Sequence, residues 1–302
     1  MRQRLLPIAI VLATFLVCGL AVMASAAPAT SLNMVTLGDS TASGTGAGDY
    51  RDRTAGVCWR SANSYSEVVA AKLRTGSRKV NLHNVACSGA SINDVRTEFK
   101  NEPAQLNALK QDTDLVLLTL GANDVSYAEF GAQCIAGDCS KAGRTVIDQM
   151  PAMSKNLLAL FGEIKARSPR AKIVTVAYGR QLTRGHNALS LHALDPVCAP
   201  VVFTGDERVE GNKVASALDA TLRETVKKAK ANGIDALFVS PYEADSVAVG
   251  KEFAGHSQCE ARVPYYRGFD SLLPTQEGKE GVLHLNRAGH AALGKLVVAG
   301  LR

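Results

Sequence analysis

The stretch Met34-Val35-Thr36-Leu37-Gly38-Asp39-Ser40 carries an apolar run directly into a glycine, an acid and a serine. A short apolar run without polar alternation predicts a strand that is covered on both faces, as in a parallel sheet. Ser40 would then lie where this strand turns into a helix, at the sheet edge where open α/β folds bind ligands. There its hydroxyl could act as a nucleophile and its backbone N–H could donate to an oxyanion. The tripeptide alone also fits a helix cap, so the choice between a nucleophile and a cap depends on the rest of the chain.

Other apolar runs have the same character and alternate with longer helical patterns. Strands are predicted near residues 34–37, 80–85, 115–120, 173–177 and 236–239, and helices over 64–73, 145–167, 209–230 and after Asn286. This alternation predicts right-handed crossovers and an α/β fold, a three-layer α/β/α sandwich with a mainly parallel five-stranded sheet. Irregular stretches are expected at 44–62, 127–144, 179–208 and 241–280. No linker rich in proline or serine divides the chain, which favours one domain over residues 27–302.

The first residues have the features of a secretory signal peptide. Arg2 and Arg4 precede an apolar stretch over 5–23, and Ala24-Ser25-Ala26 fits a cleavage site with small residues. We therefore expect a signal peptide over residues 1–26 and secretion of the remaining chain. The apolar stretch is long for a signal peptide, so an uncleaved membrane anchor is the alternative.

The net charge argues against a nucleic-acid-binding protein. The chain carries a formal charge of +6, and removal of the leader with its two arginines and no acids lowers it to +4. Nucleic-acid-binding domains have denser basic patches. The notable cluster at 227–230 lies at a predicted helix end, where cations interact favourably with the helix dipole. We expect no nucleic-acid partner.

The cysteines predict disulfides. The chain has seven cysteines, of which six follow the leader, and an even number in an exported chain indicates a disulfide framework. Many pairings are conceivable, and we favour the sequential one: Cys58–Cys87, Cys134–Cys139 and Cys198–Cys259. The short loop between the second pair contains a glycine, which suits a tight turn. No C-x-x-C pair with a neighbouring histidine indicates zinc, so no metal site is expected.

Two further turns follow predicted strands and should face the same sheet edge as Ser40. Gly89 comes after the second predicted strand, and Asn123 comes after the third. A glycine lets its backbone N–H approach a substrate closely, and an asparagine side chain can supply another N–H. Ser40, Gly89 and Asn123 could together form an oxyanion hole. The adjacent acids, Asp39 and Asp124, are expected to hold these turns in place.

A serine nucleophile also needs a base. The chain offers six histidines: His83, His186, His192, His256, His284 and His290. His284 stands apart because it lies just before Asn286, a good helix cap, and hence on the loop that enters the last helix. His290 would lie inside that helix, and His83 falls within a strand. We expect His284 to be the general base.

In chain order, Gly38-Asp39-Ser40, Gly89, Gly121-x-Asn123 and His284 resemble the four sequence blocks of the SGNH (GDSL) hydrolase superfamily. The likeness covers essentially the whole chain after the leader, and it is strongest to the secreted actinobacterial lipases and esterases. It extends to the residues around Cys58, the residues before Gly89 and the six-cysteine pattern. The resemblance implies a flavodoxin-like fold with Ser40 as nucleophile, His284 as base, and Ser40, Gly89 and Asn123 as oxyanion donors.

One position departs from that family. Its members usually carry an aspartate three residues before the histidine, and this chain has Gly281 there. A histidine base still needs an acceptor at Nδ1 to hold its tautomer. We favour the backbone carbonyl of Val282 in this role, with the displaced acid Glu280, or another acid such as Asp270, as alternatives.

These residues predict a secreted serine ester hydrolase, a lipase, carboxylesterase or phospholipase that forms an acyl-enzyme on Ser40. The preference for lipid esters rests on the resemblance. Several aromatic residues are compatible with an acyl chain, namely Tyr127, Phe130, Tyr265, Tyr266 and Phe269. We expect a monomer without cofactors whose partners are an ester or lipid substrate and, transiently, lipid surfaces. A carbohydrate O-acetylesterase with a smaller acyl pocket is the alternative, and an inactive module that binds cell-envelope lipid or glycan is a third hypothesis.

Overall fold

The computed structural model describes residues 31–51, 54–75, 78–182, 196–260 and 263–302. The predicted signal peptide, its cleavage site and two of the histidines, His186 and His192, lie outside these described residues. Within the described ranges, no helix combines the length and the apolar character needed to span a membrane.

Five parallel strands form the sheet, as predicted. They are β1 (Ser31–Gly38), β2 (Lys79–Asn84), β3 (Leu115–Thr119), β4 (Lys172–Val176) and β5 (Ala236–Val239). Their order is β2-β1-β3-β4-β5, and all neighbouring pairs are parallel. The chain passes from β1 to one side and then returns to β3 on the other side, so the order reverses between β1 and β3. Such a switch point is where open α/β sheets bind ligands at the carboxyl ends of their strands.

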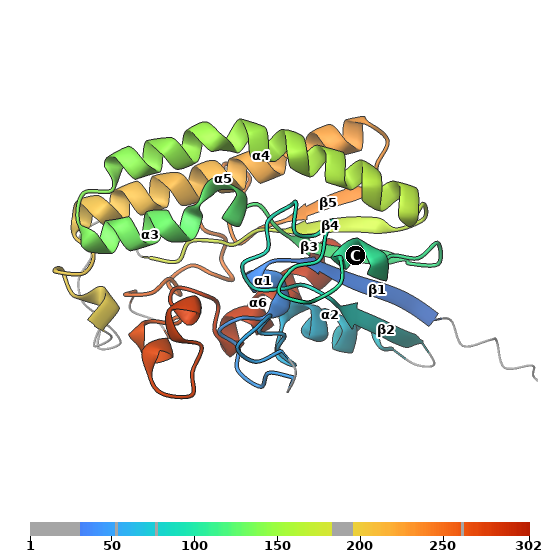
Figure 1. Ribbon diagram of the computed structural model, residues 1–302, viewed down its shortest axis with the longest axis horizontal. Helices are drawn as coiled ribbons and strands as arrows, with labels where there is room; N and C mark the ends of the chain where they lie inside the picture. The colour runs from blue at the N-terminus through green and yellow to red at the C-terminus, as the bar shows by residue number, and fades with distance from the viewer. Residues whose placement is uncertain (1–30, 52–53, 76–77, 183–195, 261–262) are drawn as a thin grey trace, which may run out of the picture.

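Helices cover both faces of the sheet (Figure 1). One face carries α2 (Tyr65–Leu73) and α6 (Arg287–Gly300), and the other carries α3 (Tyr127–Ala136), α4 (Ser140–Arg167) and α5 (Gly205–Ala231). Each layer buries its own hydrophobic cluster against the sheet, through Tyr65 and Leu293 on the first face and Phe161 and Leu222 on the second. The three-layer α/β/α sandwich is therefore confirmed. The remaining short elements are α1 (Ser40–Ser43), η1 (Gln105–Ala108), η2 (Asn123–Val125), η3 (Pro196–Cys198), η4 (Phe269–Leu272) and η5 (Gly278–Gly281).

The expectation of an irregular stretch at 127–144 was wrong. Helix α3 occupies ten residues of it, and α4 begins at Ser140 rather than near residue 145. A helix of this length is marginal by itself, and its stability comes from packing. Here Phe130 and Cys134 are buried against the core. The helix could not be predicted locally, because burial by distant elements leaves little trace in the residues themselves.

Three disulfides join the loops in the sequential pairing: Cys58–Cys87, Cys134–Cys139 and Cys198–Cys259. The first joins the segment after α1 to the turn after β2, two of the segments that meet at the carboxyl edge of the sheet. The second closes the corner between α3 and α4. Among the described residues, no group of three or more histidine, cysteine and acidic side chains could hold a metal ion.

Candidate active site

The strand β1 delivers Ser40 to a sharp turn. Gly38 has a φ of 131°, and a Cβ there would come within 2.0 Å of the carbonyl oxygen of Thr119, so only glycine fits. Asp39 caps the following turn, since its Oδ1 accepts a 3.0 Å hydrogen bond from the N–H of Thr41. The helix that follows is a single turn, Ser40–Ser43. Ser40 is thus both the first helical residue and part of a rigid turn, and a helix this short adds little dipole to its N–H.

Gln105, which the sequence did not single out, completes this turn. Its Oε1 accepts a 2.7 Å hydrogen bond from the N–H of Gly38, and its Nε2 donates at 3.0 Å to the carbonyl of the same glycine. Gln105 is buried in η1, 67 positions away along the chain. One side chain therefore bonds both backbone groups of the residue before Asp39, whose carbonyl also accepts from the N–H of Cys87 at 3.0 Å.

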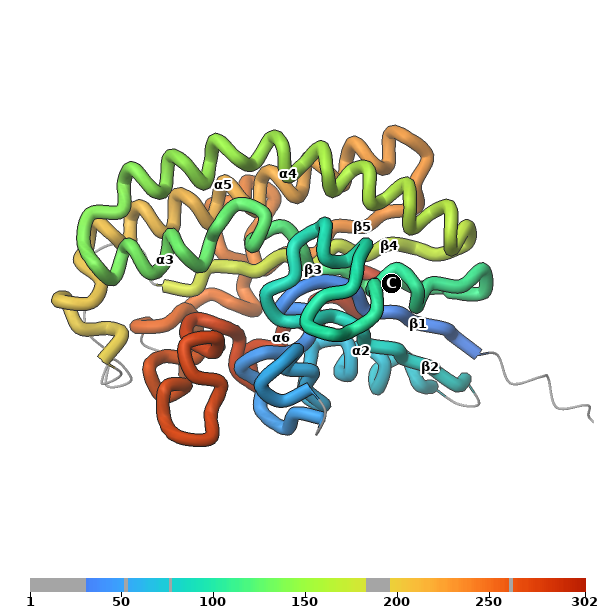
Figure 2. Tube along the Cα trace, viewed as in Figure 1, coloured from blue at the N-terminus to red at the C-terminus, as the bar shows by residue number. Residues whose placement is uncertain are grey.

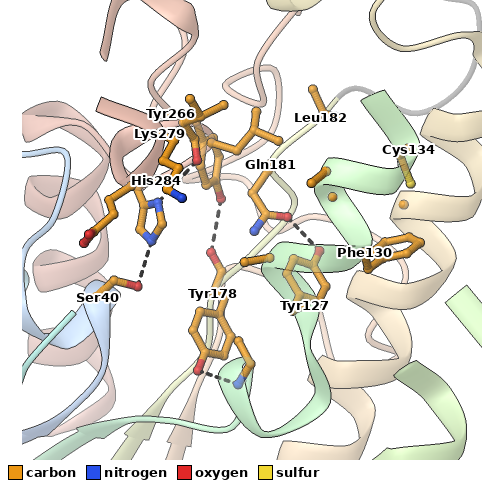
Figure 3. A pocket seen from close by; sticks show the side chains of 18 of the residues that line it. Ser40, Tyr127, Phe130, Cys134, Tyr178, Gln181, Leu182, Tyr266, Lys279 and His284 are labelled. Atoms are coloured by element: carbon orange, nitrogen blue, oxygen red, sulfur yellow. Dashed lines mark hydrogen bonds between the residues drawn. The ribbon is translucent and has the colours of Figure 1, made fainter. Parts of the chain in front are cut away.

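His284 contacts Ser40 directly (Figure 3). Its Nε2 lies 2.7 Å from the Ser40 Oγ, and its Nδ1 lies 3.3 Å from the backbone carbonyl of Val282. With the proton on Nδ1 donated to that carbonyl, Nε2 is free to accept the serine proton. Burial lowers the pKa of His284 below 6.5, so the neutral form that can act as a base persists at mildly acidic pH.

The two alternative acids have other partners. The Glu280 carboxylate accepts a 3.0 Å hydrogen bond from the Ser88 hydroxyl and lies 4.0 Å from the Lys100 ammonium. Asp270 pairs with the guanidinium of Arg267 at 2.6 Å and accepts from the N–H of Gly268. Among the described residues, the ring nitrogens of His284 have hydrogen bonds to Ser40 and Val282.

Packing closes the position of the usual family aspartate. A Cβ on Gly281 would lie 2.7 Å from the Ser271 Cβ and 2.9 Å from the Glu277 Cβ, which is closer than real Cβ contacts. The Glu277 side chain is itself buried, at 1% exposure, and pairs with Arg267 at 3.1 Å. A carboxylate on residue 281 would therefore need this cluster to move.

Arg267 and Glu277 also hold the His284 loop. The N–H of Arg267 donates to the carbonyl of His284 at 2.7 Å, and the N–H of Leu283 donates back to the carbonyl of Arg267 at 3.0 Å. The Tyr50 hydroxyl donates to Glu277 from the segment that follows α1. Figure 2 shows these two segments side by side, although more than 200 residues separate them. This contact between distant segments left no pattern in the sequence.

The other predicted donors line the same cavity as Ser40. Gly89 is exposed in its turn and has a φ of 85°, which favours glycine. Asn123 uses one amide hydrogen in a 2.9 Å bond to the carbonyl of Ala90, and this bond orients its second N–H. Asp124 accepts from the N–H of Ile92 at 3.1 Å, which joins the turn of Asn123 to the turn of Gly89. Burial raises the pKa of Asp124 to about 6.

The remaining described histidines lie elsewhere. His290 is buried within α6, where its Nδ1 accepts from the N–H of Tyr65 at 3.2 Å, and burial lowers its pKa to about 4. His256 stacks on Tyr265 with ring centroids 3.9 Å apart. His83 is exposed on β2. None of these three lines the cavity that holds Ser40 and His284.

The cavity is large and mostly apolar away from Ser40. It has a volume of about 680 Å³ and extends from the Ser40–His284 pair toward α3 and α5. Four of the five predicted aromatic residues line it: Tyr127, Phe130, Tyr266 and Phe269. Tyr265 does not, because it packs on His256 and Phe253. A cavity of this size with a few polar groups at one end is typical of a small-molecule site.

Known proteins share the family and the fold of this chain. The sequence profile of the GDSL-like Lipase/Acylhydrolase family matches residues 36–292, a range that contains Ser40, Gly89, Asn123 and His284. The chain belongs to this family. This chain is a carboxylic ester hydrolase of the GDSL lipase and esterase type.

Two relatives of this chain are Streptomyces proteins. A protein named Lipase from Streptomyces rimosus is 32% identical over 232 residues, 74% of this chain and 72% of that protein. Lipase 2 from Streptomyces coelicolor is 34% identical over 172 residues, 51% of this chain and 56% of that protein.

The GDSL fold of this chain is similar to two solved structures at 24% identity, each with a TM-score of 0.69. The match to the extracellular lipase from Streptomyces rimosus covers 89% of this chain and 98% of the lipase chain. The match to phospholipase A1 from Streptomyces albidoflavus NA297 covers 88% of this chain and 97% of the phospholipase chain. At 24% sequence identity, this likeness shows a shared fold.

Proposed function

We propose that this chain hydrolyses lipid esters through a Ser40 acyl-enzyme, with His284 as general base and the carbonyl of Val282 in place of a third acid. The observation that carries the proposal is the 2.7 Å contact between His284 Nε2 and Ser40 Oγ at the end of the large cavity. A nucleophile and a base within hydrogen-bond reach, with the base held by a further acceptor, is the arrangement that activates serine.

In the proposed mechanism, His284 takes the Ser40 proton as the oxygen attacks the ester carbonyl. The resulting tetrahedral oxyanion accepts hydrogen bonds from the N–H groups of Ser40 and Gly89 and from the Asn123 side chain. Loss of one such donor typically slows the reaction by about 10²–10³-fold. The protonated His284 then donates to the departing alcohol. Water repeats the sequence against the acyl-enzyme and releases the acid and the free serine.

The cavity supports an acyl group larger than acetyl. Its apolar wall consists of side chains from α3, α5 and the segments around them, including Phe130, Leu182 and Phe203. An acyl chain that extends in this direction from the ester carbonyl on Ser40 Oγ is covered by apolar surface, which removes the chain from water. The acetyl group of a carbohydrate O-acetylesterase substrate would leave most of this apolar wall uncontacted. We therefore place fatty-acyl esters, and lipids that contain them, ahead of acetylated glycans.

We propose secretion for the chain after about residue 26, followed by brief contact with lipid surfaces. The leader-like residues and the three disulfides support export. Leu272 lines the cavity and is 51% exposed, and its neighbour Leu273 is 61% exposed. The exposed Lys279 from the same segment also lines the mouth. Apolar and cationic side chains beside the opening suit an anionic lipid surface. A Leu273→Ser variant, whose side chain lies outside the cavity lining, should co-sediment less with phosphatidylglycerol vesicles and keep its rate on a soluble short-chain ester.

The test of the catalytic proposal uses p-nitrophenyl esters from acetyl to palmitoyl. The wild-type rate should rise from acetyl to longer chains, and Ser40→Ala and His284→Ala should each abolish it. A fluorophosphonate probe should label the wild type and fail to label Ser40→Ala. A preference for acetyl would favour the O-acetylesterase, and a wild type that neither turns over esters nor reacts with the probe would indicate a binding module.

A further inference from the structure

Tyr178 lies two residues after β4, at the same edge of the sheet as Ser40. Its ring lines the cavity, and its hydroxyl points away from the apolar end, toward the backbone of the turns (Figure 3). No motif of the family draws attention to it. Its hydroxyl nevertheless makes two hydrogen bonds to segments that approach from β1 and β3.

The first bond goes to the residue before the nucleophile. The Tyr178 hydroxyl donates to Oδ2 of Asp39, whose other oxygen accepts from the N–H of Thr41. The second bond comes from the residue before the side-chain oxyanion donor. The N–H of Ala122 donates to the Tyr178 oxygen at 3.1 Å, and Asn123 follows directly. One hydroxyl therefore joins the turn of Ser40 to the turn of Asn123.

We propose that Tyr178 is a positioning residue that holds two oxyanion donors, the Ser40 N–H and the Asn123 amide, at a fixed separation through Asp39 and Ala122. The inference rests on the proposed function, because it assumes that these donors bind the oxyanion. The contribution of an oxyanion hole depends on donors that are held in place before the reaction. A displacement of about 1 Å can cost roughly 10²-fold in rate.

The third donor belongs to the same network. Asn123 donates to the carbonyl of Ala90, next to Gly89, at 2.9 Å. Asp124 accepts from Ile92 in that same turn. Tyr178 thus joins the turn of Ser40 to the turn of Asn123. The bonds of Asn123 and Asp124 join the turn of Asn123 to the turn of Gly89. The three turns carry donors from three different strand ends, and these bonds add to the backbone bonds at the strand ends, which run from the N–H of Asp39 to the carbonyl of Thr119 and from the N–H of Cys87 to the carbonyl of Gly38.

Counting hydrogens shows how the network depends on charge. With Asp39 ionised, the Tyr178 hydrogen has an acceptor and the Tyr178 oxygen has a donor, so every group is paired. A proton added to Asp39 would lie on Oδ2, because the N–H of Thr41 faces Oδ1. Only one hydrogen fits between the two oxygens, so the other would turn away and lose its acceptor, and the charge-assisted bond between the turns would become a weaker neutral one.

The surroundings of Asp39 place this protonation near neutral pH. Burial raises the pKa of Asp39 to about 7, although the bonds from Tyr178 and from the N–H groups of Thr41 and Ala42 oppose the rise. The other titratable groups that face it are Asp124 from η2, which raises its pKa further, and Tyr65 from α2. His284 has a pKa below 6.5. The acid limb of kcat/KM should therefore fall near pH 7, set by Asp39.

The experiment compares Tyr178→Phe with Tyr65→Phe, which also removes a buried, hydrogen-bonded hydroxyl but lies outside the cavity. For Tyr178→Phe we expect kcat to fall about 10- to 100-fold with KM changed less than about threefold, since the ring that lines the cavity remains. Its acid limb should also move to higher pH, because the lost bond had lowered the pKa of Asp39. Tyr65→Phe should keep both the wild-type kcat and the wild-type limb.

Asp39→Asn gives a second, independent variant. It should have a reduced kcat at every pH, and its acid limb should lie at lower pH than that of the wild type, because residue 39 no longer titrates. If Tyr178→Phe matches Tyr65→Phe in kcat and in pH profile, the positioning role is refuted. Should Tyr178→Phe fail to fold, an Asp39→Asn limb that stays near pH 7 refutes it instead. Activity that survives in Ser40→Ala would overturn the proposed function itself, whereas an inactive Ser40→Ala with an unaffected Tyr178→Phe would overturn this inference alone.

Discussion

Restoring the usual family aspartate should damage this enzyme rather than improve it. In a Gly281→Asp variant, the new Cβ would lie 2.7 Å from the Ser271 Cβ, 2.9 Å from the Glu277 Cβ and 3.0 Å from Glu277 Oε2. Overpacking a close-packed site typically costs about 1–3 kcal/mol. The new carboxylate would also lie beside the buried Glu277 carboxylate, with Arg267 as their shared cation. Two like charges at one buried site disfavour ionisation of the second, so an effective acid is not expected.

For a domain of this size, a loss of about 1–3 kcal/mol corresponds to a fall of roughly 2–12 °C in Tm. We also expect kcat/KM to fall, because Glu277 and Arg267 hold the backbone on either side of His284. Thermal unfolding followed by circular dichroism and hydrolysis of a p-nitrophenyl ester measure the two effects. Gly162→Asp is the matched control, since a Cβ there meets nothing within 4 Å, and it should change neither quantity. A Gly281→Asp enzyme with wild-type Tm and a tenfold higher kcat/KM would show that the site has room for a third acid, and the steric argument would be refuted.

The fold could be predicted because short, continuous apolar runs indicate parallel strands that are buried on both faces of a sheet. The strand ends then brought Ser40, Gly89 and Asn123 to one edge, since the carboxyl ends of parallel strands share that edge. What the sequence could not supply were contacts between distant segments. Gln105 lies 67 positions from Gly38, and the partner of Tyr178 is 139 positions away.

The question of the third acid shows the same limit. Glu280 and Val282 both lie near His284 along the chain, and spacing alone left the choice between them open. The direction of the Glu280 side chain follows from Ser88, 192 positions earlier, with Lys100 beside it. Closure of the Gly281 position follows from Ser271 and Glu277, whose packing no local pattern records. The role of the Val282 carbonyl stays a prediction, supported by its 3.3 Å distance from Nδ1.

Further outcomes are expected from the same contacts. Gln105→Ala should lower stability by roughly 1–3 kcal/mol, because both backbone groups of Gly38 lose a buried partner, and urea unfolding should show a lower midpoint. An unchanged midpoint would mean that water replaces the side chain. Replacing Cys134 and Cys139 with serine should raise KM for palmitoyl more than for acetyl esters, since α3 lines the acyl wall and would lose its covalent link to α4. Equal KM changes for both esters would contradict that assignment of the wall.

The central claim is that His284 activates Ser40 without a side-chain acid. Its most direct test is the kcat/KM of a Glu280→Gln, Asp270→Asn double variant measured beside that of His284→Ala on one ester substrate. We predict a loss of less than about tenfold for the double variant and at least about 10³-fold for His284→Ala. A double variant as inactive as His284→Ala would mean that one of these carboxylates completes a triad, and it would contradict the dyad.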